Sequence, residues 1–158
     1  MDQNEVLNGT KEHLAYILNA LGLTAEVSLE FAPSDDGTTD KYIQATLKGE
    51  GLNDLVGFHG KNMESIQNVM SIILSRQFQK DLRLLLEVND YRERREKYLQ
   101  DIAERASGEV ISTGQNVELP PMKAYERRAI HIALRGREGI LTESVGEGEE
   151  RRIIIKKV

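Results

Sequence analysis

The sequence contains no cysteine and no tryptophan, and only 5% of its 158 residues are aromatic. The lack of cysteine excludes disulfides and thiolate chemistry, which agrees with a reducing compartment, and we expect the protein in the cytoplasm. No apolar run approaches the roughly 18 residues that a membrane-spanning helix requires, so we expect no membrane insertion. The acidic N-terminus lacks the layout of a signal peptide. What is present, 39% apolar and 30% charged residues, is typical of a globular protein.

Positive charge is scarce, with a net charge of −5 for the whole sequence. Residues 1–90 contain 7 Lys and Arg against 14 Asp and Glu, whereas residues 91–158 contain 14 against 12, so the halves carry −7 and +2. Binding of a nucleic-acid backbone depends on how many phosphates Lys and Arg neutralise. We therefore expect any such binding to be modest and its salt dependence to be shallow.

Catalytic signatures are also absent. The three histidines, His13, His59 and His131, fall in separate predicted elements. The motifs of zinc proteases, serine hydrolases and P-loop nucleotide-binding proteins do not occur. We expect a protein that is not an enzyme and that has no cofactor and no metal site.

Apolar residues in the first half recur at helical and strand spacing in turn. They predict helix, strand, strand, helix, helix and strand at residues 4–21, 25–31, 43–47, 52–56, 61–79 and 82–88. A turn at 33–37 joins the first two strands, which we expect to pair antiparallel. The expected core positions of the long helix are Met63, Ile66, Val69, Met70, Ile73 and Leu74.

Two glycines stand directly before this long helix. Gly57 and Gly60 enclose Phe58 and His59, and Lys61 follows. Glycine lets the backbone approach a ligand closely, and the start of a helix directs unpaired N–H groups and the positive end of its dipole toward that ligand. We therefore expect residues 57–61 to bind an anion such as a phosphate.

The loop and the apolar pattern around it resemble the KH domain, which binds single-stranded nucleic acid through a G-x-x-G loop. The order of elements over residues 1–89 is similar to the type II, bacterial form of that fold. The resemblance implies that the loop clamps a nucleic-acid backbone. Phe58 and His59 stand where Lys or Arg often occurs in the family, and we expect Phe58 to stack on a base or to pack against a partner protein.

The second half begins with a predicted helix at residues 91–106, and strands are expected at 140–145 and 151–157. A basic cluster in the first turns of that helix is expected to face solvent, with a secondary ligand site as the alternative, and it comprises Arg92, Arg94, Arg95 and Lys97. Between the helix and the strands, Leu119-Pro120-Pro121 is expected to open another helix.

That helix is amphipathic, with 3.6 residues per turn. Its expected apolar face comprises Met122, Tyr125, Ala129, Ile132 and Ala133. The polar side carries the stripe Lys123, Arg127, His131 and Arg135, with Arg128 beside it. His131 is expected nearly opposite the apolar face, where Arg127 can hold a phosphate with two N–H groups and His131 can donate a hydrogen bond to the same or the next phosphate.

The sequence Leu119-Pro120-Pro121, together with Tyr125-Glu126-Arg127-Arg128 and His131, resembles the R-3-H domain, which binds single-stranded nucleic acid. That resemblance implies an α-β-α-β-β order for residues 90–158. A type II KH domain (α-β-β-α-α-β) followed by an R-3-H domain is similar to the bacterial Jag family, also called KhpB. The likeness spans the whole chain, and we expect a form that lacks the family's additional N-terminal domain.

The family likeness implies an α+β RNA-binding protein of the cytoplasm that acts in post-transcriptional regulation linked to cell elongation and division. It implies single-stranded RNA as ligand, with single-stranded DNA as the alternative, and a small KH-domain protein or a second copy as partner. The residues assigned to nucleic acid are Gly57, Phe58, His59, Gly60, Lys61, Lys123, Arg127, Arg128, His131 and Arg135. Alternatively, the acidic first half is a protein-interaction or dimerisation module that does not bind nucleic acid.

Overall fold

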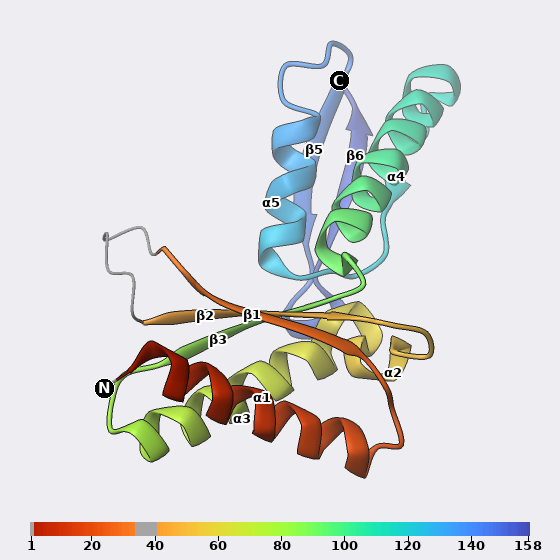
Figure 1. Cartoon of the computed structure of the whole chain (residues 1–158). Helices are drawn as coiled ribbons and strands as arrows, with labels where there is room; N and C mark the ends of the chain where they lie inside the picture. Colours follow the sequence, from red (N-terminus) through yellow and green to blue (C-terminus); the bar gives the residue numbers. More distant parts are fainter. Residues whose placement is uncertain (1, 34–40) are drawn as a thin grey trace. The chain divides into compact units, whose positions relative to one another are not determined.

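The computed structural model describes residues 2–33 and 41–158. The chain divides into two compact units, one ending at Tyr91 and the other comprising residues 92–158, and each has its own hydrophobic core. Each unit combines helices with a three-stranded sheet (Figure 1), which confirms the predicted α+β class. The turn expected at 33–37 lies mostly outside the described residues.

The N-terminal unit has the predicted order of elements, with one short 3-10 turn, η1, in addition. Its elements are α1 (Gln3–Ala20), β1 (Glu26–Ala32), β2 (Tyr42–Lys48), α2 (Asn53–Val56), η1 (Phe58–Gly60), α3 (Lys61–Phe78) and β3 (Arg83–Val88). The strand order is β1-β2-β3, with β1 antiparallel and β3 parallel to β2. Helices α1 and α3 lie side by side over one face of this sheet (Figure 1).

Alternation along the strands directs apolar side chains toward these helices. The buried strand residues are Ile43, Ala45, Leu47, Leu84, Leu86 and Val88. Two apolar residues of the predicted helices are instead exposed: Val69, an expected core position, at 54%, and Leu21, at the end of the first predicted helix, at 56%. Val69 lies about 100° around the helix from the buried Met70, and Leu21 is the C-cap residue beyond the last turn of α1.

Helix α3 also occupies the outer edge of strand β3. Backbone N–H groups of this edge donate to side-chain oxygens spaced one turn apart on the helix, in the pairs Leu82 to Ser75, Leu84 to Ser71 and Leu86 to Gln67, at 3.0, 2.9 and 3.0 Å. An open edge strand would offer these groups to another chain. The bonds fix α3 against the sheet, and with it the helix start that follows the glycine loop.

The C-terminal unit has the α-β-α-β-β order that the R-3-H resemblance implies. Its elements are α4 (Tyr91–Thr113), β4 (Val117–Glu118), α5 (Ala124–Ala133), β5 (Ile140–Val145), η2 (Gly148–Glu150) and β6 (Arg152–Lys157). Strand β6 is central and antiparallel to both β4 and β5. The core residues of this unit are Leu99, Ala103, Ala106, Val110, Leu119, Met122, Ile130, Leu134, Ile140, Ile153 and Ile155.

The start of α5 differs from the expectation. The helix begins at Ala124, after both prolines. The backbone N–H of Leu119 donates to the carbonyl of Ile153 at 2.9 Å, and that of Met122 donates to the carbonyl of Arg151 at 3.1 Å. The segment with the prolines therefore continues the path of β4 beside β6, and its extended course delays the first helical turn.

Candidate nucleic-acid interface

The loop between α2 and α3 has a backbone that only glycine adopts readily. Gly57 has φ 69° and ψ −174°, and Gly60 has φ 77° and ψ 13°. A Cβ atom at Gly57 would lie 2.5 Å from Cγ of Asn62, and one at Gly60 would lie 3.1 Å from Cε1 of Tyr91. Both glycines are thus required by backbone conformation and by close packing.

Hydrogen bonds within the loop hold this shape. Asn62 Nδ2 donates to the carbonyl of Asp54 at 2.7 Å, so the start of α3 is tied back to α2. The N–H of Gly57 donates to the carbonyl of Asn53 at 3.0 Å. Gly60 is the N-cap residue of α3 and gives the helix no side-chain cap. The exposed Lys61 follows at the first helical position.

The two residues between the glycines form an aromatic pair. The rings of Phe58 and His59 stack with centroids 3.9 Å apart and planes 22° apart. Phe58 is 73% exposed, and His59 has a positive φ of 52°. The loop therefore presents an apolar ring to solvent beside the helix start.

The buried side of α5 is not the predicted apolar face. Glu126 and Ile130 are buried within the helix, and Leu134 follows them after its end. Of the expected face only Met122 is buried, whereas Tyr125 and Ile132 are 59% and 54% exposed. The helix is rotated relative to the prediction because a carboxylate occupies a position of its buried stripe.

An ion pair with α4 makes the burial of Glu126 feasible. The fully buried carboxylate accepts hydrogen bonds from Arg95 Nε at 2.7 Å and Arg95 Nη2 at 3.4 Å. It also accepts the backbone N–H of Lys123, the N-cap residue, at 3.0 Å. A buried charge requires such partners. Arg95, which was expected to face solvent, is only 14% exposed.

His131 lies beside the buried stripe and is half-buried. Its Nδ1 lies 2.7 Å from Oγ1 of Thr142 on β5, a contact that sequence reasoning missed. Burial lowers the pKa of His131, and the charge of Arg127 lowers it further. The imidazole is therefore anchored to the sheet, and its neutral form is favoured.

The arginines on α5 and just after it keep most of their hydrogen-bonding capacity. Arg127 is half-buried, and its Nη1 donates to the carbonyl of Met122 at 2.7 Å. Arg128 and Arg135 are exposed. Within residues 2–33 and 41–158, none of these three guanidinium groups forms an ion pair. Most guanidinium N–H groups of this surface are therefore available to an anion.

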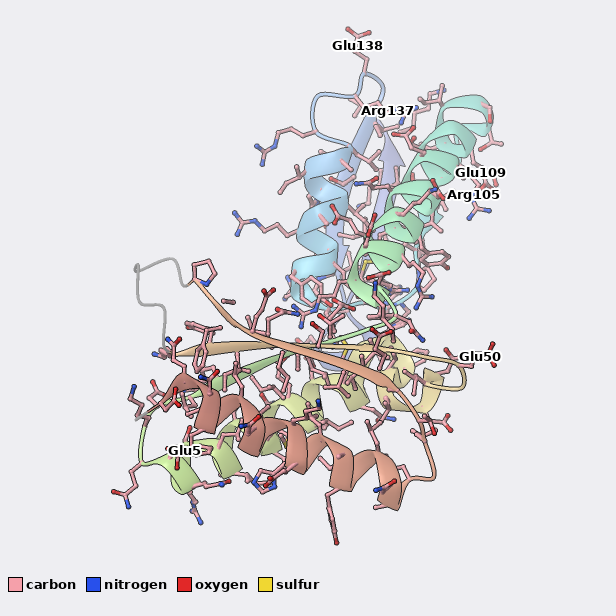
Figure 2. The ribbon with its side chains drawn as sticks, viewed as in Figure 1. Glu5, Glu50, Arg105, Glu109, Arg137 and Glu138 are labelled. Carbon is pink, nitrogen blue, oxygen red and sulfur yellow. The ribbon has the colours of Figure 1, made fainter. Side chains whose placement is uncertain are left out.

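Several other cations of the unit are neutralised by carboxylates. Arg137, which follows α5 (Figure 2), pairs with Glu104 of α4. Arg152 pairs with Glu118 at 2.7 Å, and Lys156 of β6 pairs with a carboxylate of β5. The exposed side of α5 is consequently a basic surface in a unit whose net charge is only +2.

Neither a metal centre nor a membrane span emerges from the described part of the chain. Within residues 2–33 and 41–158, no cluster of three or more His, Asp or Glu side chains has an arrangement that could hold a metal ion. No helix in these ranges is long and apolar enough to cross a membrane.

An α-β-α-β-β unit whose second helix carries an arginine and a histidine one turn apart defines the R-3-H domain, and residues 97–157 match that domain family. Most of the chain is also similar to curated bacterial proteins named RNA-binding protein KhpB. It is 32% identical over 144 residues to the protein of Clostridium symbiosum, over 91% of this chain and 63% of that relative.

Identity is 30% over 144 residues with the Lactiplantibacillus plantarum protein, over 91% of this chain and 42% of the relative. Identity is 24% over 157 residues with the Bacillus subtilis protein, over 98% of this chain and 72% of that relative. The chain thus spans less than two thirds of the length of the first two relatives. The resemblance predicted from the sequence is confirmed: residues 97–157 match the R-3-H domain, and most of the chain is similar to bacterial proteins named KhpB.

Proposed function

We propose that this protein is a non-catalytic, cytoplasmic protein that binds single-stranded RNA and holds its phosphate backbone at two places. One is the loop at residues 57–61, and the other is the face of α5 that carries Arg127 and His131. The match to the R-3-H domain and the RNA-binding relatives support this proposal. On the same likeness we propose a role in post-transcriptional regulation linked to cell elongation and division.

The observation that carries the proposal is the way Arg127 and His131 are held. They lie about 6 Å apart along the helix axis, since each residue rises 1.5 Å. Arg127 uses one of its five N–H donors on the carbonyl of Met122. The remaining donors suit two oxygens of one phosphate. A fixed side chain loses less entropy when it binds.

In the proposed complex His131 acts as a hydrogen-bond donor. Nδ1 lies 2.7 Å from the hydroxyl of Thr142, and we assign that hydroxyl as the donor, so that the neutral ring carries its proton on Nε2. The Nε2–H group of His131 then donates to the phosphate next to the one held by Arg127. Protonation of the ring adds a positive charge, which strengthens the interaction with phosphate.

The glycine loop is proposed to bind a backbone phosphate chiefly through main-chain N–H groups at the start of α3, with Lys61 beside them. Phe58 supports a base-stacking contribution because its ring is 73% exposed. Two weak sites on one chain raise the overall affinity for a single strand that reaches both.

A second candidate function concerns the first unit alone. Its charge of −7 over residues 1–90 opposes a polyanion, and the exposed ring of Phe58 suits a protein contact. In this alternative the unit binds a small KH-domain protein or a second copy of the chain, while the second unit holds RNA. Light scattering of the wild type and of Phe58→Ala, alone and with such a protein, distinguishes the two roles.

The proposal is tested by fluorescence anisotropy with a short, labelled single-stranded RNA. We expect Arg127→Ala/His131→Ala to weaken binding at least tenfold, because hydrogen bonds to charged groups contribute about 1.5–3 kcal/mol each. Gly60→Asp and the milder Lys61→Ala test the loop. Arg105→Ala is the matched control, since this arginine of α4 lies outside both regions (Figure 2).

Each variant is first compared with the wild type by circular dichroism and thermal unfolding, so that loss of binding is not confused with loss of folding. Unchanged affinity in both the loop variants and the α5 double variant would exclude the proposal. Loss only in the double variant would leave RNA binding to the second unit and support the alternative role for the first.

A further inference from the structure

The exposed side of α5 has two chemically different halves. Its basic half carries the half-buried Arg127 and His131, and the exposed Arg135 follows just beyond the end of the helix. The other half carries Tyr125 and Ile132, which are 59% and 54% exposed. This ten-residue helix therefore presents two large, mainly apolar side chains at its surface.

The positions on the helix make these two residues neighbours of the cations. Residues advance about 100° each around the helix, so Tyr125 and Ile132, seven positions apart, lie within about 20° of each other. Arg128 is three positions after Tyr125 and four before Ile132, and it is exposed. A guanidinium group therefore stands between an aromatic ring and an aliphatic side chain on one continuous surface.

This surface borders a shallow groove of about 240 Å³ between α4 and α5. The side formed by α4 comprises Glu96, Leu99 and Gln100, and the side formed by α5 comprises Ala129, Ile130, Ile132 and Ala133. The small alanines of α5 leave the groove open toward solvent. It lies on the flank of α5 away from the His131 contact with β5.

We infer that Tyr125, with Ile132 beside it, is a stacking platform for the bases of a strand whose phosphates lie along the basic half of α5. The inference rests on the proposed function. The charge near the platform favours an anionic ligand, since Arg128 lies beside it on α5 and Arg135 follows the helix, and neither forms an ion pair within the described ranges. A polyanion with flat apolar groups complements that combination.

The platform indicates which class of nucleic acid the surface binds. Aromatic side chains and guanidinium planes stack on bases that are not paired. A duplex keeps its bases inside and presents only phosphate and sugar to a helix surface of this kind. The second unit therefore discriminates single strands from double strands, which phosphate contacts alone cannot do.

The test compares three ligands of equal length: single-stranded RNA, the same backbone with abasic sites, and double-stranded RNA. The proteins are the full-length wild type, Tyr125→Ala, Tyr125→Phe and Arg127→Ala/His131→Ala. Tyr16→Ala is the matched control, because Tyr16 is 76% exposed on α1 of the other unit. Circular dichroism melts establish that each variant is folded.

We expect Tyr125→Ala to weaken binding of base-bearing single strands about 5- to 150-fold, since stacking on an aromatic ring contributes about 1–3 kcal/mol. Tyr125→Phe and Tyr16→Ala retain wild-type binding. Abasic RNA binds the wild type and Tyr125→Ala with the same, weaker affinity. Ile132→Ala gives a smaller loss in the same direction.

Wild-type affinity of Tyr125→Ala for base-bearing RNA would overturn the inference, and so would an equal loss on abasic RNA. In either case a loss of binding in Arg127→Ala/His131→Ala leaves the proposed function standing. Unchanged binding in that double variant overturns the proposed phosphate site itself. The two failures are thus distinguishable in one set of titrations.

Discussion

Replacing Glu126 by glutamine tests how the R-3-H unit positions its basic helix. The substitution keeps the size of the side chain and one oxygen that accepts hydrogen bonds, but it removes the charge that pairs with Arg95. Because Glu126 is fully buried and Arg95 is only 14% exposed, the guanidinium group would be left without a counter-charge away from water. Removing one partner of a buried pair costs about 3–5 kcal/mol.

We expect the lower end of that range, about 3 kcal/mol, because glutamine still accepts one hydrogen bond. This corresponds to roughly a 150-fold increase in the equilibrium constant for opening α5. Native-state hydrogen exchange of the amides at residues 124–134 measures this opening directly and does not depend on the first unit. The same variant is expected to bind RNA more weakly, because Arg127 follows Glu126 directly.

Glu104→Gln is the matched control, because its pair with Arg137 is solvent-exposed, with side chains 58% and 36% accessible. Exposed pairs contribute less than about 1 kcal/mol. Equal protection of α5 in Glu126→Gln and Glu104→Gln would refute the reasoning. The double variant Arg95→Met/Glu126→Gln is expected to recover part of the loss, since it also removes the unpaired buried charge.

Three further predictions concern the glycine loop and the histidine. Gly57→Ala is expected to destabilise the first unit by about 1–3 kcal/mol through its strained backbone alone. Adding Asn62→Ala should relieve only the clash between the new Cβ atom and the Asn62 side chain. An unchanged free energy of unfolding in urea would contradict this. The pKa of His131 is lowered from 6.5 in the folded protein, so the unfolded chain takes up a proton at a higher pH than the folded protein does. The free energy of unfolding is therefore expected to decrease as the pH falls below 6.5. His131→Gln should lack that component, and identical pH–stability curves for the two proteins would disprove it. Thr142→Val should weaken RNA binding several-fold with little loss of folding, because it removes the hydrogen bond that orients the ring; unchanged affinity would dismiss this role.

The sequence predicted those features that depend on local periodicity. Alternating apolar residues from Leu82 to Val88 predicted a strand, and β3 occurs there with every second residue buried. The glycine spacing predicted a tight turn before a helix, and both glycines have positive φ. Residue chemistry and short-range spacing determine these features, so no knowledge of distant contacts was needed.

The rotation of α5 was not predictable in this way. A glutamate among arginines favours a surface position, and the apolar Tyr125 and Ile132 favour a buried one. The actual arrangement depends on the pair between Glu126 and Arg95, which are 31 positions apart in the chain. The contact of His131 with Thr142 likewise joins a helix to a hairpin. Such pairs are set by tertiary packing, and a single sequence does not reveal them.

The central claim is that α5 holds phosphates of a single strand through Arg127 and His131. Nuclear magnetic resonance titration of the His131 imidazole, with and without saturating single-stranded RNA, tests it most directly. A phosphate beside the ring favours its charged form, so the pKa of His131 is expected to rise when RNA binds. Superimposable titration curves, at an RNA concentration where binding is complete, would contradict the account.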